Sequence, residues 1–198
     1  MGASLAVRVE PPAVPQIQRD LAMPLLRPGA YRWERLEDPY CRINLLFVPD
    51  QVLEVAIACH PTGRHDIRLS FGLCHQAVEF GELVGNGFDR PALHRKGFGT
   101  LAVNVAIQAL RMTCPPSAPV EGFLSNVDED VLPLEERQRL AVNRRAFWRR
   151  FGVSVITDRM GMDRLDGTVG QLRLVESGAI EGLGSRIVPL SAFQRFRS

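Results

Sequence analysis

The chain has 198 residues, of which 45% are hydrophobic and 23% are charged, a composition that is ordinary for one globular domain. Its 24 basic and 22 acidic residues leave a formal net charge of +2, so the overall charge argues for no particular partner. No apolar run approaches the length of a transmembrane helix, and the N-terminus lacks the basic start and apolar core of a secretory signal. We therefore expect a cytoplasmic protein without a membrane partner.

The first half of the chain is predicted to consist of strands. Residues 1–16 contain Pro11, Pro12 and Pro15 and are expected to form a flexible lead-in, whereas 17–198 form a single domain. Beyond Pro39, four runs of β-branched and apolar residues separated by turn residues are typical of strands: RINLLFV, VLEVAIACH, IRLSFGLC and AVEFGELV.

After Gly99 the pattern becomes helical. The polar residues of 101–112 are Asn104, Gln108 and Arg111, which fall on one narrow stripe of a helix. A helix that is apolar over the rest of its circumference must be mostly buried, and it usually lies on a sheet.

A second helix is predicted from about Leu134 to Arg150. Pro133 precedes it, acidic residues occupy its first turn, and Gly152 follows its end. VEGFLSNV between the two helices is predicted to be a strand, as are VSVIT and TVGQLRLVE after the second helix, with DRMGMDRLDG as the loop that joins them. The order of elements predicts an α/β domain with a mixed sheet.

The junction before the first helix, His94 to Thr100, has the sequence HRKGFGT. Glycine weakens a helix, but it also lacks the Cβ that would keep a phosphate away from the backbone. The first N–H groups of a helix have no intrahelical partners and carry partial positive charge. The junction is therefore an anion site or simply a turn. It is not a Walker loop, since Lys96 precedes the glycines, and a dinucleotide-binding loop would need a third glycine.

The segment PALHRKGFGTLAVNVAIQAL resembles the coenzyme-A loop of the GNAT superfamily of acyl-CoA-dependent N-acetyltransferases. In that family a proline, a short basic stretch and Gly-x-Gly lead into a helix whose N-terminus holds the pyrophosphate of coenzyme A (CoA). Pro91 and the run from Arg95 to Gly99 match this loop, whereas His94 stands where arginine or glutamine is usual.

A second resemblance lies at the end of the second predicted helix. AFWRRFGV, residues 146–153, is similar to the end of a later helix in the family. VEGFLSNV occupies the place of the strand that separates from its neighbour to admit the pantetheine arm. The resemblance spans about residues 78–175 and implies an α/β (α+β) fold, with a central mixed, mostly antiparallel sheet flanked by helices.

The resemblance implies an N-acyltransferase that moves an acetyl or other acyl group from CoA to an amine of a small molecule or peptide. Acetyl-CoA or another acyl-CoA would be the cosubstrate, and no metal is implied. The residues implied to contact it are His94, Arg95, Lys96, Gly97, Phe98, Gly99, Thr100, Leu124 and Trp148.

The proton-transfer groups depart from the family pattern. Trp148 stands where the family often has a tyrosine that acts as general acid, and an indole N–H does not release a proton near neutral pH. The candidate general bases are Glu82 and Glu79 on the strand before the loop. A regular strand would place them on opposite faces, and we favour Glu82 because it is nearer to the loop.

The four cysteines form no close-spaced pair, so their spacing predicts neither a zinc ribbon nor a disulfide framework. Cys59-His60 and Cys74-His75 are adjacent pairs, and on a strand each pair would offer only one ligand to the same face. We expect buried structural cysteines and no metal.

The sequence leaves two other functions open. With Trp148 in place of tyrosine, the chain could be a GNAT-like CoA-binding or regulatory module without catalytic activity. The basic end of the second helix, with Arg144, Arg145, Arg149 and Arg150, is compatible with an acyltransferase acting on charged RNA, although such charges usually form a solvated face. A homodimer is also left open.

Overall fold

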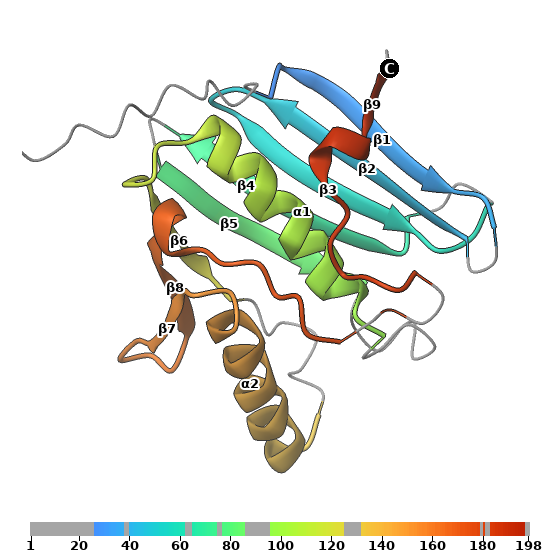
Figure 1. Cartoon of the computed structure of the whole chain (residues 1–198). Coiled ribbons are helices and arrows are strands. Elements are labelled where there is room, and N and C mark those ends of the chain that lie inside the picture. The colour runs from blue at the N-terminus through green and yellow to red at the C-terminus, as the bar shows by residue number, and fades with distance from the viewer. Residues whose placement is uncertain are drawn as a thin grey trace, which may run out of the picture.

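The computed structural model describes residues 26–37, 40–61, 65–74, 77–85, 96–124, 132–178, 180 and 183–196. These residues form an α+β fold in which one large mixed sheet carries two α-helices (Figure 1). The predicted lead-in, residues 1–16, lies outside the described residues. None of the described helices combines the length and the apolar character that crossing a membrane requires.

The first half of the sheet is an antiparallel meander of five strands. β2 shows why these runs become strands: its residues Cys41, Ile43, Leu45 and Phe47 are buried and alternate with residues that are less buried or exposed. Four of the strands confirm the sequence prediction closely. The five are β1 (Gly29–Arg35), β2 (Cys41–Val48), β3 (Val52–Ala58), β4 (Ile67–Cys74) and β5 (Ala77–Val84).

The second half adds both helices and the other strands. α1 (Phe98–Thr113) connects β5 to β6 (Pro119–Phe123) and packs on β3 and β4. α2 (Leu134–Arg149) leads to the hairpin of β7 (Ser154–Thr157) and β8 (Asp163–Thr168). The nine strands lie in the order β7-β8-β6-β5-β4-β3-β2-β1-β9, and β5–β6 is the parallel pair among those described.

Every residue of α1 from 98 to 110 except Gln108 is buried, as its narrow polar stripe predicted. α1 covers one face of the sheet, and the hydrophobic core lies between them. The second helix does not cover the sheet in this way: Figure 1 shows that α2 extends away from it.

The C-terminal part of the chain differs from the prediction. The strand after β7 is β8, which begins inside the predicted loop. The sequence pattern does not reveal it, because its buried residues are only Asp163 and Leu165. TVGQLRLVE does not form the predicted strand, since Leu172 and Val175 are buried outside the sheet. The described residues of 172–190, which we call the C-terminal strap, instead run beside α1, and β9 (Gln194–Phe196) then pairs with β1.

The polar stripe of α1 binds the backbone of the strap. Arg111 Nη2 donates to Leu172 O near the end of the helix. Further toward its N-terminus, Asn104 Nδ2 donates to Val175 O at 3.0 Å and accepts at Oδ1 from Val175 N–H at 2.9 Å. Gln108 Nε2 donates to Val188 O at 3.1 Å on the returning part of the strap. The polar stripe of α1 therefore contacts the backbone of the strap and does not face solvent.

Candidate functional site

The glycine loop joins α1 at Gly97. This residue is the N-cap and has a φ of 93°, a left-handed conformation that glycine adopts without steric strain. The first helical hydrogen bond runs from Leu101 N–H to Gly97 O at 3.0 Å. The N–H groups of the three preceding residues, Phe98 to Thr100, therefore lie before the helical hydrogen bonds begin, and the N-cap supplies no side chain to bind them.

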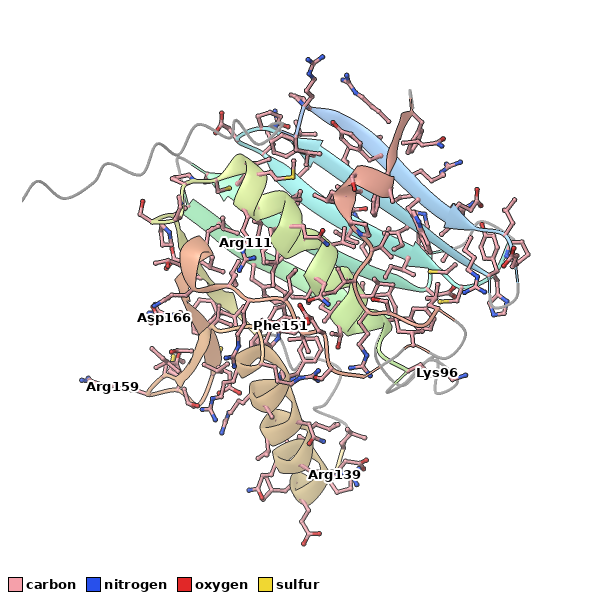
Figure 2. All side chains as sticks on the ribbon, viewed as in Figure 1. Lys96, Arg111, Arg139, Phe151, Arg159 and Asp166 are labelled. Carbon is pink, nitrogen blue, oxygen red and sulfur yellow. The ribbon has the colours of Figure 1, made fainter. Side chains whose placement is uncertain are left out.

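The surroundings of this helix end are apolar and positively charged. Phe98 is 6% exposed and Thr100 is 3% exposed, so the first turn is buried. The turn contains no acidic residue that would offset the positive end of the helix dipole. Lys96 is exposed beside it, with its side chain extending away from the helix (Figure 2). His94 and Arg95, which the sequence also assigned to this site, lie outside the described residues.

An arginine from the C-terminal strap lies at the same end of α1. A Cβ on Gly97 would lie 2.8 Å from Arg186 Nε, and a Cβ on Gly178 would lie 2.7 Å from Arg186 Nη2, so the guanidinium packs against both glycines. Arg186 Nε is buried and has no hydrogen-bond partner among the described residues. No sequence pattern points to Arg186, because its place depends on how the strap folds back along the helix.

The strands that α1 connects share only a short ladder. β5 and β6 are paired at Val78↔Val120 and Glu79↔Glu121, and their remaining residues are not paired with each other. Just beyond these pairs β5 contains a bulge against β4, in which Gly81 is the extra residue. Gly122 of β6 still approaches β5 so closely that a Cβ there would lie 2.6 Å from Phe80 O. The parallel pairing of β5 and β6 therefore ends where the bulge begins.

The bulge changes where the two candidate bases point. Glu79 pairs with Gly72 and Glu82 pairs with Ser70, and these two partners lie on the same face of β4 because they are two residues apart. The expectation that the glutamates occupy opposite faces is therefore wrong, since Gly81 adds one residue between them. Both glutamates are exposed. They face away from the side of β5 that carries its buried core residues.

Trp148 and Leu124, the other two residues assigned to CoA, are core residues. Trp148 is 4% exposed and lies in an aromatic cluster at the end of α2. Its ring centroid is 4.9 Å from that of Phe80, at an interplanar angle of 73°, and 6.2 Å from that of Phe151. Leu124 directly follows β6 and is 6% exposed. The cluster lies beside the end of the β5–β6 ladder, since Phe80 is part of it.

A partly buried ion pair joins the end of α2 to the β7–β8 hairpin. Arg145 Nε donates to both oxygens of Asp163, at 2.9 and 2.8 Å, and Thr157 Oγ1 donates to Asp163 Oδ1 at 2.7 Å. Burial alone raises the pKa of Asp163, but the hydrogen bonds from Arg145 and Thr157 outweigh it, so this pKa lies below its ordinary value. Asp163 is therefore a structural carboxylate.

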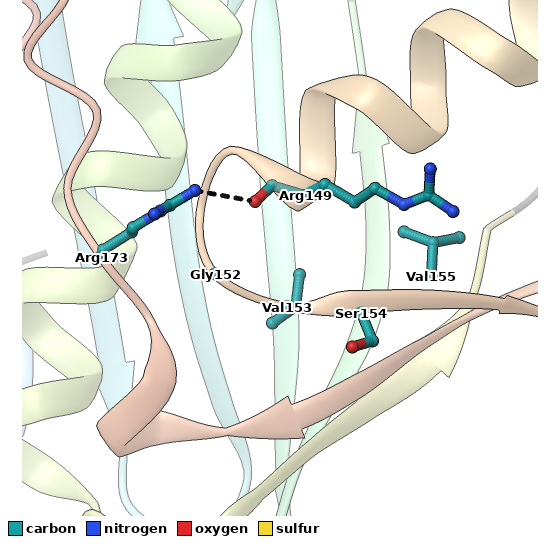
Figure 3. Close-up of a pocket in the computed structure, with 6 residues that line it drawn as sticks. All are labelled: Arg149, Gly152, Val153, Ser154, Val155 and Arg173. Carbon is teal, nitrogen blue, oxygen red and sulfur yellow. Dashed lines mark hydrogen bonds between the residues drawn. The ribbon is translucent and has the colours of Figure 1, made fainter.

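An open pocket of about 460 Å³ lies beyond the end of α2 (Figure 3). Arg173 lines it and caps the helix, because Nη2 donates to Arg149 O at 3.4 Å and Nε donates to Arg150 O at 2.8 Å. None of the loop residues 96–100 lines this pocket, so it is separate from the helix end described above. Its lining residues are Arg149, Gly152, Val153, Ser154, Val155 and Arg173.

The expectation of buried cysteines holds for Cys41 alone, because Cys59 and Cys114 are partly buried and Cys74 is exposed. Burial raises the pKa of the Cys41 thiol to about 12. Burial also raises the pKa of the Cys114 thiol, so neither group is a thiolate near neutral pH. Within the part of the chain that the structure describes, no three His, Cys, Asp or Glu side chains are grouped so as to hold a metal ion.

No protein-family model matches the chain, and no curated protein sequence matches it significantly. An argument about the function therefore rests on the residues at the start of α1 and on those where the pairing of β5 and β6 ends.

Proposed function

We propose that the protein is a cytoplasmic, GNAT-like N-acyltransferase, which transfers an acetyl or another acyl group from CoA to an amine. The observation that carries this proposal is the connection of two features by one helix. α1 begins with a glycine N-cap and a first turn without acidic residues, and it joins two parallel strands, β5 and β6, that pair over only two residues. In the family that the sequence resembles, these two parts hold the pyrophosphate and admit the pantetheine arm.

The arrangement of the described elements supports a GNAT-like architecture. The strands pair antiparallel on both sides of the β5–β6 pair, and α1 covers one face of the sheet. α2 follows β6 and ends in the aromatic cluster that contacts β5. The described residues of the motif-bearing segment, about residues 78–175, include both helices and the short parallel pair.

The first turn of α1 is the proposed pyrophosphate site. The N–H groups of Phe98, Gly99 and Thr100 would supply donors, next to the Arg186 guanidinium that packs against Gly97. Lys96 adds positive charge beside the first turn. The pantetheine arm would then pass toward β5 and β6, near the buried side chains of Leu124 and Trp148.

Acyl transfer needs an oriented thioester, a donor for its carbonyl oxygen and a group that removes the ammonium proton. The bulge at Gly81 interrupts the ladder, so a backbone N–H there is the proposed carbonyl donor. Glu82 would take the amine proton, and Glu79 lies on the same face. The amine nitrogen then bonds to the acyl carbon and the carbon–sulfur bond breaks. The second proton of the amine passes through water to the leaving thiolate, because Trp148 cannot supply one.

Calorimetry with acetyl-CoA and longer acyl-CoAs tests the proposal. We expect binding of at least one of them, followed by release of free thiol when amines are added. Glu82→Gln should abolish most thiol release and leave CoA binding unchanged, whereas Glu37→Gln, a change at another exposed carboxylate, should affect neither. Absence of binding at millimolar acyl-CoA would overturn the proposed function.

A second function of a different class is a GNAT-like module that binds CoA without transferring its acyl group. Trp148 favours it, because this residue replaces the usual proton donor and is buried in the aromatic cluster. Such a module would bind CoA in the calorimeter but release no thiol with any amine. The thiol assay therefore separates the two functions.

A further inference from the structure

We propose that Cys41 and Cys59 are a modification site, at which a small disulfide oxidises the two thiols to a cross-strand disulfide between β2 and β3. The site lies in the antiparallel meander and does not depend on the proposed acyl transfer. It rests on the register of the β2–β3 ladder and on the burial of the two side chains.

The β2–β3 ladder brings the two cysteines together. Its outermost pair is Arg42↔Ala58. Cys41 precedes Arg42 and still pairs with Arg35 of β1, so the chain remains extended there. Cys59 follows Ala58, and one further step of the antiparallel register sets it directly opposite Cys41. Such residues have Cα atoms about 4.5–5.5 Å apart, inside the range of about 4.4–6.8 Å that a disulfide spans.

The two side chains belong to the same face of the sheet. Cys41 begins the buried row of β2 that continues with Ile43, and Cys59 continues the row of β3 that contains Ile57. Ile43 and Ile57 are themselves a cross-strand pair in the core. Cys41 is 0% exposed, whereas Cys59 is partly buried and packs against the core. The thiols are therefore neighbours on the core face, at the end of the ladder.

The backbone of Cys59 is fixed beside this ladder although the residue follows the end of β3. Its N–H donates to Asp66 Oδ2 at 2.7 Å. Asp66 N–H in turn donates to Ile57 O at 2.8 Å, and Asp66 is 4% exposed. The residue before β4 thus holds the end of β3 in place. A disulfide at this position requires rotation of two side chains and little movement of the backbone.

The difference in exposure sets the order of the reaction. The more accessible thiolate, that of Cys59, attacks the small disulfide, forms a mixed disulfide and releases one small thiolate. Cys41 becomes accessible when the end of β2 opens, because it is the first residue of that strand. Its thiolate then attacks the sulfur of Cys59 and displaces the second small thiolate. The two protein thiols are oxidised, the small disulfide is reduced to two thiols, and the protons of the cysteines pass through water to these products.

Oxidation of the native full chain with oxidised glutathione tests the inference. After the reaction, N-ethylmaleimide blocks the remaining thiols and trypsin digests the protein. Trypsin cuts after arginine, so Cys41 and Cys59 fall in separate peptides, 36–42 and 43–64. We expect mass spectrometry to find these two peptides linked, and the link to disappear when the digest is reduced.

Thermal unfolding and two variants complete the test. The oxidised wild type should unfold at a Tm about 5–10 °C higher than the reduced protein, because the disulfide restricts the unfolded chain. Cys59→Ala should show neither the linked peptides nor this oxidant-dependent shift. Cys74→Ala is the matched control, since Cys74 is exposed, and it should keep both.

The results that would overturn the inference follow from the same digest. Absence of the linked peptides from the native protein overturns it, and a glutathione adduct at Cys74 in that sample confirms that the oxidant was active. A link that forms only in urea also overturns it, because the two thiols would then not be neighbours in the fold. Linkage of Cys59 mainly to Cys74 or to a second chain would exclude the pairing with Cys41.

Discussion

The two helices have the same length, 16 residues, and are held in opposite ways. α1 lies between the sheet and the C-terminal strap, and its polar side chains bind backbone groups of the strap. α2 has a single buried residue, Trp148, in its last turn, and the rest of the helix extends from the body (Figure 1). Helix length alone therefore says little about which positions stabilise the fold. Those positions are the ones where each helix contacts the rest of the chain.

The strongest test of this comparison is Trp148, the buried residue of α2. Trp148→Ala would remove the ring that contacts Phe80, Phe147 and Phe151, and would leave a cavity. We expect the free energy of unfolding, measured in urea, to fall by about 3–5 kcal/mol. Trp148→Phe keeps an aromatic ring and should lose less than half as much. A loss below about 1 kcal/mol for the alanine variant would show that α2 is anchored elsewhere.

The next effect is expected where α1 binds the strap. Asn104 is 0% exposed and its amide makes three hydrogen bonds to strap backbone, to the N–H and O of Val175 and to Arg186 O. Asn104→Ala leaves these groups buried without partners, so we expect a loss of about 2–4 kcal/mol in the free energy of unfolding.

Gln108→Ala is the control for the same surface. Gln108 is only partly buried, and its bonds to Val188 O and from Leu190 N–H measure 3.1 and 3.3 Å. Its replacement should cost about 1 kcal/mol, and limited proteolysis should cut the strap faster in the Asn104 variant than in this one. Equal losses in the two variants would mean that the strap is held by its apolar side chains rather than by the stripe.

These contacts also show which parts of the fold can be predicted from the sequence. Period and turn residues predicted β2 to β5 and both helices, because each depends on residues close in sequence. β1, β8 and β9 were missed, since β8 buries few residues and β9 is stabilised by pairing with β1 at the other end of the chain. The stripe of α1 was recognised, but the segment that covers it was not.

The candidate site also contains residues that the local sequence predicts and residues whose place depends on the tertiary fold. The glycine loop before α1 could be found from local sequence, because glycine at a helix start has a physical meaning by itself. Arg186 could not, since it reaches the loop only through the fold of the strap. The common face of Glu79 and Glu82 depends on the bulge at Gly81, and alternation along a strand predicts the opposite.

A smaller effect is expected at the ion pair that ties α2 to the hairpin. Asp163→Asn should lower the free energy of unfolding by about 1–3 kcal/mol near neutral pH, because Arg145 loses its partner but is itself partly exposed. The pKa of Asp163 lies below its ordinary value, so the folded state stabilises the ionised carboxylate relative to the unfolded state. This stabilisation is present above about pH 4 and is lost as the pH falls through the lowered pKa.

Urea unfolding of both proteins across this range measures the effect. The wild type should lose stability as the solution becomes acidic, and its advantage over Asp163→Asn should narrow below about pH 4. A constant difference at all pH values would mean that the side chain acts through packing and not through its charge.

The smallest effect is expected in the exposed turns of α2. Arg139 Nη2 contacts Glu136 Oε1 at 3.0 Å, three residues apart, and the two side chains are 66% and 36% exposed (Figure 2). Solvent and salt screen such a pair, so Arg139→Ala should change the free energy of unfolding by less than about 0.5 kcal/mol at low salt and by nothing measurable at high salt. A loss as large as that of Asp163→Asn would show that these turns pack against another part of the chain. An unchanged fold makes Arg139→Ala useful in a second way, because any change in its binding of RNA or substrate would then come from the lost charge on α2 and not from a damaged structure.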